Sequence, residues 1–225
     1  AERVQGALGK VAANLAGAVK RGKLSAEEQE AAQARLSGGS DSASAVADAA
    51  IVIEAIPESL ELKKRVLAEV ASQNPNLALI GTNTSSLPVT EIAQATALPE
   101  RVIGLHFFNP VHISKLLEIV QGERTSEATL ALALQLAERI GKNPIVVRDA
   151  PGFASSRLGL VLGLEAMRML ETSVASAEDI DRAMELGYRH PMGPLKTTDY
   201  VGLDVRLAIA EHLHAEIGEA FRPPL

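Results

Sequence analysis

The residues of this chain that could do chemistry stand where apolar runs end or are interrupted. His106 lies between apolar neighbours in the segment GLHFFNP, and Glu118 interrupts the aliphatic run LLEIV. A histidine whose second ring nitrogen is oriented by a carboxylate is a general recipe for taking a proton from a hydroxyl group. The small polar residues of the segment NTSS, residues 83–86, could present hydroxyls and amides to a ligand. Together these residue types predict a site for proton abstraction.

Each of the three segments also has a purely structural interpretation. A lone histidine at such a position is often a core residue whose hydrogen bonds are satisfied. Strand alternation could turn Glu118 outward to solvent, since a carboxylate buried among aliphatic side chains is costly without a partner. Asn, Thr and Ser are also the residue types that favour turns and helix N-caps, so residues 83–86 could simply connect a strand to a helix.

Hydrophobic periodicity predicts the elements that must position these residues. Apolar runs rich in β-branched residues predict strands at 49–57, 77–83, 101–108, 116–122 and 143–149. We expect the first of them, AAIVIEAIP, to be covered on both faces. Helical periodicity predicts helices at 1–22, 25–36, 58–73 and 126–141, the second with a capping box from Ser25 to Glu28. The alternation indicates an α/β fold with a mainly parallel sheet, whose ligands bind outside the carboxyl ends of the strands.

After the segment DAPG, residues 149–152, the pattern becomes wholly helical. Helical segments are expected near 153–173, 177–187 and 194–218. The change of pattern predicts two domains, residues 1–149 with the sheet and residues 150–225 with helices only.

Composition excludes several classes of protein. The chain has 225 residues, of which 47% are hydrophobic and 22% charged, so it can bury a sizeable core. A net charge of -6 gives no general attraction to nucleic acid or to a membrane surface. The absence of cysteine, of a bilayer-spanning apolar run and of a signal-peptide pattern favours a cytoplasmic protein. No metal is expected, because the 5 histidines show no ligand spacing.

Several motifs, in the same order, resemble the L-3-hydroxyacyl-CoA dehydrogenase family. They are NTSSLPV, GLHFFNPV, the glutamate that follows the histidine in the next strand, DAPGF, and GYRHPMGPLKTTDYVGLD. The two longest, GLHFFNPV and HPMGP followed by DYVGLD, are specific enough that chance recurrence in an unrelated fold is not expected. The resemblance implies a Rossmann-like sheet domain followed by an all-helical domain. It also implies NAD as cofactor, an acyl-CoA substrate and a place in fatty acid β-oxidation.

The resemblance also implies roles for individual residues. His106 is expected to take the proton of the substrate 3-hydroxyl while hydride leaves C3 for the nicotinamide, and Glu118 is expected to pair with His106. Ser85 matches the serine that bonds the substrate oxygen. The residues that match cofactor-binding positions are Glu58, Lys63, Asn83, Ser85 and Asn109. Without the resemblance, Glu58 and Lys63 would be interpreted as a solvated helix start.

Two further predictions concern a basic cluster near the start of the chain and an apolar helical segment of the second domain. The basic cluster Lys20, Arg21 and Lys23 is expected near the phosphates of coenzyme A, with a solvated helix end as the alternative. The segment 158–172 is apolar nearly all round and must be buried, which predicts a homodimer through residues 150–225 or, alternatively, an internal core helix.

The chain departs from the family pattern in two ways. Similar enzymes carry an asparagine in the motif after Pro-Gly-Phe, and Ser156 takes that place here; its shorter side chain predicts looser substrate positioning and lower turnover. No Gly-x-Gly-x-x-Gly segment follows a strand, and a stretch beyond Pro223-Pro224-Leu225 is also absent. If the chain begins at Ala1, weak NAD binding or none is expected.

Two other functions compete with the dehydrogenase. One is a non-catalytic remnant or dimerisation module of the same family, although such a protein has no physical reason to keep His106, Glu118 and Ser85 together. The other is a dehydrogenase for a free hydroxy acid or sugar acid, which would need its own cationic clamp for the substrate carboxylate.

Overall fold

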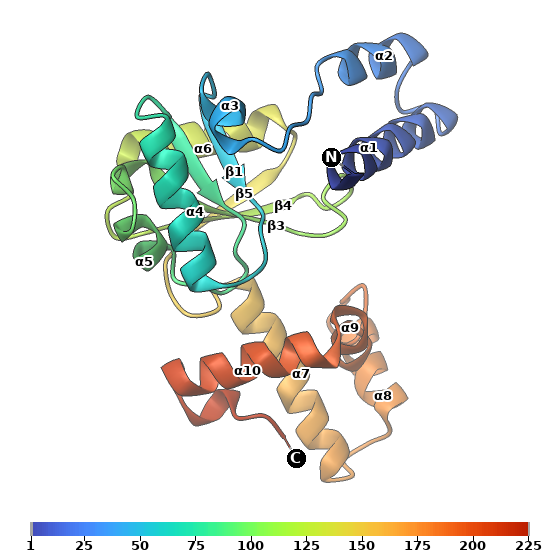
Figure 1. The fold of residues 1–225 in the computed structure, drawn as a ribbon. Coiled ribbons are helices and arrows are strands. Elements are labelled where there is room, and N and C mark those ends of the chain that lie inside the picture. Colours follow the sequence, from blue (N-terminus) through green and yellow to red (C-terminus); the bar gives the residue numbers. More distant parts are fainter. Residues whose placement is uncertain (1, 225) are drawn as a thin grey trace. The chain divides into compact units, whose positions relative to one another are not determined.

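The structure is a computed structural model that describes residues 2–224, and it divides between Ala49 and Ala50 into two compact units (Figure 1). The first unit consists of the helices α1 (Glu2–Lys20), α2 (Ala26–Ala34) and α3 (Ser42–Val46). The predicted capping box is confirmed, because the Glu28 amide donates to Ser25 Oγ at 3.1 Å and the Ser25 amide donates to Glu28 Oε2 at 2.8 Å. Helix α3 was not predicted, since five residues are too few to show a helical period.

The second unit contains a five-stranded sheet in the order β1-β2-β3-β4-β5. Its strands are β1 (Ile51–Glu54), β2 (Leu79–Thr82), β3 (Val102–Phe107), β4 (Leu116–Gln121) and β5 (Asn143–Arg148). All neighbours pair in parallel except β3 and β4, which are antiparallel. A short loop joins these two, and such a connection is too short for a parallel crossover. The prediction of a mainly parallel sheet is therefore confirmed.

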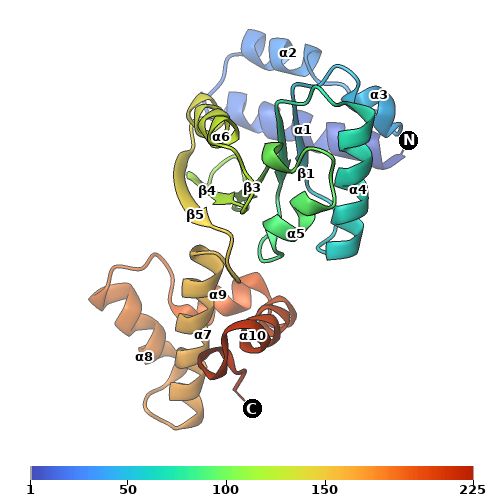
Figure 2. The same ribbon diagram turned by 90° about the vertical axis from the view of Figure 1, so that its left-hand side faces the viewer.

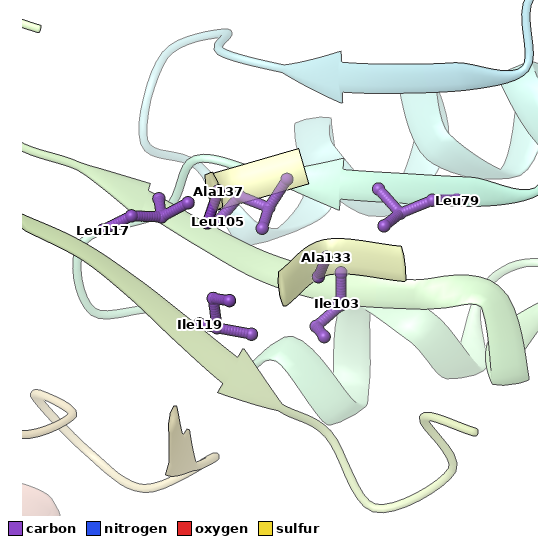
Figure 3. Packing of buried hydrophobic residues seen from close by; sticks show 7 residues of the cluster. All are labelled: Leu79, Ile103, Leu105, Leu117, Ile119, Ala133 and Ala137. Carbon is purple, nitrogen blue, oxygen red and sulfur yellow. The ribbon is translucent and has the colours of Figure 1, made fainter. Parts of the chain in front are cut away.

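Helices cover both faces of the sheet. Helix α6 (Glu127–Arg139) packs on one face, and its alanines allow a close approach to the aliphatic residues of β2, β3 and β4 (Figure 3). The buried cluster consists of Leu79, Ile103, Leu105, Leu117, Ile119, Ala133 and Ala137. Helices α4 (Leu60–Gln73) and α5 (Val89–Gln94) follow β1 and β2, and the 3-10 turn η1 (Pro99–Arg101) leads into β3. Because side chains alternate along a strand, His106 and Glu118 lie on the face opposite α6.

The two edge strands are less covered than their sequences suggest. The expectation that the first strand is covered on both faces is wrong for this chain, because Ile53 is 42% exposed. Val146 in β5 is 46% exposed. Both strands lie at the edges of the sheet, whereas the buried cluster is centred on β2, β3 and β4.

The remaining helices follow β5 (Figure 2, orange to red). They are α7 (Ser155–Glu171), α8 (Ala177–Arg182), the π-helical turn η2 (Ala183–Gly187), α9 (Pro194–Val201), α10 (Leu203–Ile217) and the 3-10 turn η3 (Glu219–Phe221). The single helix expected at 194–218 is wrong, since Gly202 adopts a φ of 104° and separates α9 from α10. Buried side chains of α7, α10 and η3 pack together, namely Leu160, Leu164, Ala210, Leu213 and Phe221.

Helix α7 is not buried on all sides within this chain. Leu158 is 63% exposed and Leu170 is 45% exposed, although Leu160 and Leu164 are buried. The alternative of an internal core helix is therefore wrong for the single chain. The exposed apolar face of α7 leaves the other alternative, a surface that a second copy covers, as a prediction.

Candidate active site

His106 and Glu118 form a pair across the antiparallel strands β3 and β4. They are direct partners in the register of the two strands, and His106 Nδ1 lies 2.9 Å from Glu118 Oε2. The exposed fractions of the two side chains are 8% and 0%. The interpretation of Glu118 as an outward-facing residue is therefore wrong. The hairpin geometry explains why a glutamate in the following strand can meet this histidine.

The carboxylate of Glu118 also caps the start of helix α7. Its Oε1 accepts the backbone N–H groups of Ala154 at 2.9 Å and Ser155 at 3.0 Å, and its Oε2 accepts the Ser155 hydroxyl at 2.6 Å. The first amides of a helix have no partner in the helix and favour an anion. Glu118 thus fixes the helix to the sheet at the point where the imidazole lies.

These contacts decide the ionisation of Glu118. Burial raises the pKa of this carboxyl, but the hydrogen bonds from His106, Ser155 and Ala154 together lower it from 4.5 to about 2. The carboxylate is therefore charged at neutral pH and accepts a proton-bearing Nδ1. The Nε2 of a neutral His106 is then the nitrogen that can accept a proton.

Aromatic rings surround the imidazole. The ring centroid of His106 lies 4.5 Å from that of Phe108 and 6.0 Å from that of Phe153. Phe153 is buried and has a φ of 49°, so it belongs to a tight turn between β5 and α7. An apolar surround of this kind limits water around a proton-transfer site.

The loop after β2 lies against the start of α7. The hydroxyl of Ser156 donates to the backbone oxygen of Ser85 at 3.2 Å, so the structure brings these two predicted site residues together. Thr84 Oγ1 accepts the amide of Leu87 at 2.9 Å, as in a turn. The N-cap interpretation of this segment is wrong, because the N-cap residue of α5 is Pro88 and the first amides of the helix donate to Asp149 instead.

Glu58 binds this loop from the other side. Its Oε1 accepts the Thr84 hydroxyl at 2.5 Å and the Ser85 amide at 2.9 Å. The side chain nevertheless remains 39% exposed. Glu58 can therefore hold the loop and still meet a ligand.

Lys63 is wholly buried, which contradicts its interpretation as part of a solvated helix face. Its ammonium lies 2.7 Å from Glu54 Oε1 and 3.3 Å from Glu58 Oε2. Glu54 was not among the predicted site residues. The sequence did contain a signal for it, because Glu54 is a carboxylate at the end of an apolar run, like Glu118.

The other predicted cofactor residues lie at the carboxyl ends of the strands. Asn83 follows β2, and its Oδ1 accepts the Phe107 amide at 2.9 Å. Asn109 is exposed in the loop after β3, before a cis peptide bond to Pro110. With Glu58 after β1, three adjacent parallel strands each present a polar side chain at one edge. This set of carboxylate and carboxamide groups fits the hydroxyl-rich ribose of a nicotinamide nucleotide.

The basic residues expected near coenzyme A belong to the first unit. Lys20 is the last residue of α1, and Arg21 and Lys23 lie in the turn that follows. All three are exposed.

The HPMGP motif lies where the side chain of Asp181 caps the start of helix α9. Asp181, which is 3% exposed, accepts the amides of Leu195 at 2.8 Å and Lys196 at 3.2 Å at the start of α9. A Cβ on Gly193 would lie 2.3 Å from the Asp181 side chain. Only glycine leaves room there for this cap.

Two models of a known protein family match this chain, one over the part with the sheet and the other over the helical part that follows. The model of the 3-hydroxyacyl-CoA dehydrogenase NAD binding domain matches residues 1–150, and that of the C-terminal domain matches residues 152–225. The chain belongs to the 3-hydroxyacyl-CoA dehydrogenase family. The Rossmann-type sheet and the helical C-terminal part expected from the resemblance are thereby confirmed.

Relatives in the family span more residues than this chain. It is 45% identical over 174 residues to a probable 3-hydroxybutyryl-CoA dehydrogenase of Bacillus subtilis, covering 77% of this chain and 61% of the relative. It is 43% identical over 172 residues to the 3-hydroxybutyryl-CoA dehydrogenase of Clostridioides difficile, covering 76% and 61%. The chain thus spans less than two thirds of the length of these relatives.

Solved structures agree in fold. The 3-hydroxybutyryl-CoA dehydrogenase of Escherichia coli K12 has a TM-score of 0.95 at 40% identity, covering 100% of this chain and 48% of that one. The (S)-3-hydroxybutyryl-CoA dehydrogenase of Ralstonia eutropha has a TM-score of 0.93 at 37% identity, covering 98% and 78%.

Two further observations bear on the class of site. Within residues 2–224, no group of three acidic or histidine side chains is arranged to hold a metal ion. Each helix in the same range is too short or too polar to span a bilayer.

Proposed function

We propose that this member of the 3-hydroxyacyl-CoA dehydrogenase family interconverts L-3-hydroxyacyl-CoA and 3-ketoacyl-CoA with NAD. The observation that supports this function most strongly is the buried pair of His106 and Glu118, with a distance of 2.9 Å from Nδ1 to Oε2. Two of the similar relatives are named for 3-hydroxybutyryl-CoA, which supports a short acyl chain.

His106 is the general base of the proposed reaction. Glu118 holds the proton on Nδ1, so that Nε2 takes the proton of the substrate 3-hydroxyl as the C3–O bond becomes a carbonyl. Glu118 stabilises the imidazolium that forms and keeps its own charge, because its pKa is about 2. In the reverse direction the same imidazolium returns the proton to the carbonyl oxygen.

Ser85 and Ser156 are proposed to position the substrate oxygen near His106. Their contact at 3.2 Å places both at the junction of the β2 loop and α7. The Ser85 hydroxyl can donate to the oxygen on C3 while the proton moves, and the Ser156 hydroxyl can do so by exchanging its bond to the Ser85 backbone oxygen.

NAD, when bound, accepts the hydride that leaves C3. Glu58, Asn83 and Asn109 are proposed to hold its nicotinamide ribose at the carboxyl edge of the sheet. The exposed cluster of Lys20, Arg21 and Lys23 is proposed to meet the phosphates of the coenzyme A group. The domain boundary near residue 150 is part of the same proposal, with the helical domain completing the substrate site.

The test is NADH oxidation with acetoacetyl-CoA by the parent protein and by His106→Ala. We expect the substitution to lower kcat/KM by about 10³-fold, because it removes the proton acceptor. His214→Ala on α10 is the matched control, since its imidazole pairs only with Glu219 near the surface. Circular dichroism checks that both variants fold. An inactive parent would instead favour the non-catalytic remnant.

A homodimer through residues 150–225 is also proposed. A groove of about 360 Å³ lies on these helices, lined by apolar side chains that include Leu160, Leu164, Leu203, Leu207 and Pro223. Other apolar residues of the same helices, such as Leu158 and Tyr200, are also exposed and could be covered by a second copy. We propose a cytoplasmic location as well, to be checked by cell fractionation.

The dimer is tested by sedimentation of Leu203→Glu. A charge in the groove is expected to raise the dimer dissociation constant at least about tenfold. Ile140→Glu is the control, because Ile140 is 44% exposed but lies outside the helical domain. Equal sedimentation of Leu203→Glu and the parent would contradict the proposal.

A further inference from the structure

The buried ammonium of Lys63 is surrounded by three acceptors of the same chain. It donates to Glu54 Oε1 at 2.7 Å and to the backbone oxygen of Ile56 at 3.2 Å, and it lies 3.3 Å from Glu58 Oε2. A lysine has three N–H donors; two of them make hydrogen bonds here, and Glu58 is an ion-pair partner. Its side chain is also only 1% exposed. The ammonium therefore lies behind Glu58 and links it to Glu54.

Glu54 is equally enclosed. Its Oε1 accepts the Ile56 amide at 2.6 Å as well as Lys63, and its Oε2 accepts the Thr82 hydroxyl at 2.6 Å. The side chain of Glu54 is 2% exposed. A buried carboxylate with a full set of donors is held in one position.

These contacts form a continuous polar chain that starts and ends next to the same loop. It runs from Thr82 at the end of β2 through Glu54, Lys63 and Glu58 to the amide of Ser85. The exposed fraction falls from 39% at Glu58 to 1% at Lys63, so the fixed charges lie behind the exposed one. The buried pair therefore holds the carboxylate that in turn holds the Ser85 loop.

We propose that Glu54 and Lys63 are positioning residues that place Ser85 through Glu58. The catalytic part of this inference rests on the proposed function, since Ser85 matters for turnover only if it meets the substrate. The part that concerns the loop stands on the contacts alone. Without Lys63, Glu58 loses its ion-pair partner and the amides of Ser85 and Ser86 lose a fixed acceptor.

The experiment uses the double variant Glu54→Gln/Lys63→Met. Removing only Lys63 would leave Glu54 charged and buried without a counterion, and that protein could fail to fold. The double variant removes both charges together, so we expect it to fold. Glu61→Gln is the matched control, because this carboxylate lies on the same helix, is 84% exposed and is outside the site.

Three readouts separate positioning from other roles. We expect the Ser85 and Ser86 amides to exchange hydrogen about tenfold faster in the double variant, with the amides of β3 unchanged. We expect kcat to fall about tenfold while the dissociation constant of NADH, measured by its fluorescence, changes less than about threefold. Glu61→Gln should match the parent in all three.

Other results would overturn the proposal in recognisable ways. Loss of NADH affinity with an unchanged kcat would make Lys63 a cofactor ligand instead. Faster exchange throughout the sheet would show that the pair only stabilises the fold, and unchanged exchange at Ser85 would show that it does not hold the loop. If the parent has no dehydrogenase activity but Ser85 and Ser86 respond as expected, the proposed function fails and the positioning of the loop stands.

Discussion

Two carboxylates are buried in the sheet of the second unit, and different partners stabilise their charges. Glu118 in β4 is 0% exposed, and Glu54 at the end of β1 is 5% exposed. Both accept a hydroxyl and at least one backbone amide, Glu118 from α7 and Glu54 from Ile56 and Thr82. They differ in the cationic or proton-bearing partner that completes each set, His106 for Glu118 and Lys63 for Glu54.

The partners give the two regions different chemistry. Lys63 is a buried ammonium held between two carboxylates, so the Glu54 region can hold its neighbours in place. An imidazole has two nitrogens, and Glu118 occupies only one of them. The comparison indicates that a buried carboxylate marks a reactive site when its partner keeps one titratable atom for a ligand.

The strongest way to test this comparison is to neutralise each carboxylate in turn. In Glu118→Gln, the carboxamide oxygen can still meet the amides of α7, but its NH₂ then faces His106 Nδ1 and favours the tautomer with the proton on Nε2. We expect kcat/KM to fall about 10³-fold. The comparison is Glu54→Gln, which we expect to lower kcat/KM at most about tenfold and to destabilise the fold instead.

Steady-state kinetics of both variants measures the loss of activity, and urea denaturation measures the loss of stability. A loss of activity in Glu54→Gln as large as in Glu118→Gln, in a folded protein, would contradict the division of roles.

The second prediction concerns acid. The pKa of Glu118 is lowered from 4.5 to about 2 in the folded protein, so its contribution to stability is complete above about pH 4.5. This contribution is lost as the pH falls through about 2, because the folded state must then be protonated as well. The expected size is about 3 kcal/mol from the shift of the pKa.

Urea denaturation at several pH values between 6 and 2 measures this loss. The same series on Glu118→Gln is the control, because a carboxamide does not titrate. If the free energy of unfolding fell equally with pH in both proteins, Glu118 would not be the cause of the loss of stability in acid.

Much of the sheet could be predicted from the sequence, and the reasons are physical. The strands are short apolar runs bounded by turn residues, and each was found within a few residues. The pairing of His106 with Glu118 was predictable in kind, since a carboxylate among aliphatic residues needs a partner. Gly202 was visible in the sequence, but a glycine alone does not say whether a helix breaks there.

Other contacts carry no local signal. Ser155 donates its hydroxyl to Glu118 from a helix that starts 37 residues later, and nothing in the sequence around it distinguishes this serine from its neighbour Ser156. The burial of Lys63 was also hidden, because the helix start around it carries Glu61 and Lys64 as a solvated face would. Tertiary packing decides which of two adjacent lysines turns inward.

The smallest expected effect concerns Ser156, whose hydroxyl lies 3.2 Å from the Ser85 backbone oxygen. Similar enzymes have an asparagine here, and a carboxamide reaches further and offers two donors. Ser156→Asn is therefore expected to raise kcat/KM for acetoacetyl-CoA by about threefold to tenfold, since better positioning acts on the reaction rather than on the fold. Ser155→Asn is the matched control, because it makes the same change one residue earlier and removes a hydroxyl from Glu118. An increase in Ser155→Asn would show that the gain is not specific to position 156. A decrease in Ser156→Asn with unchanged stability would show that serine suits this position better than asparagine.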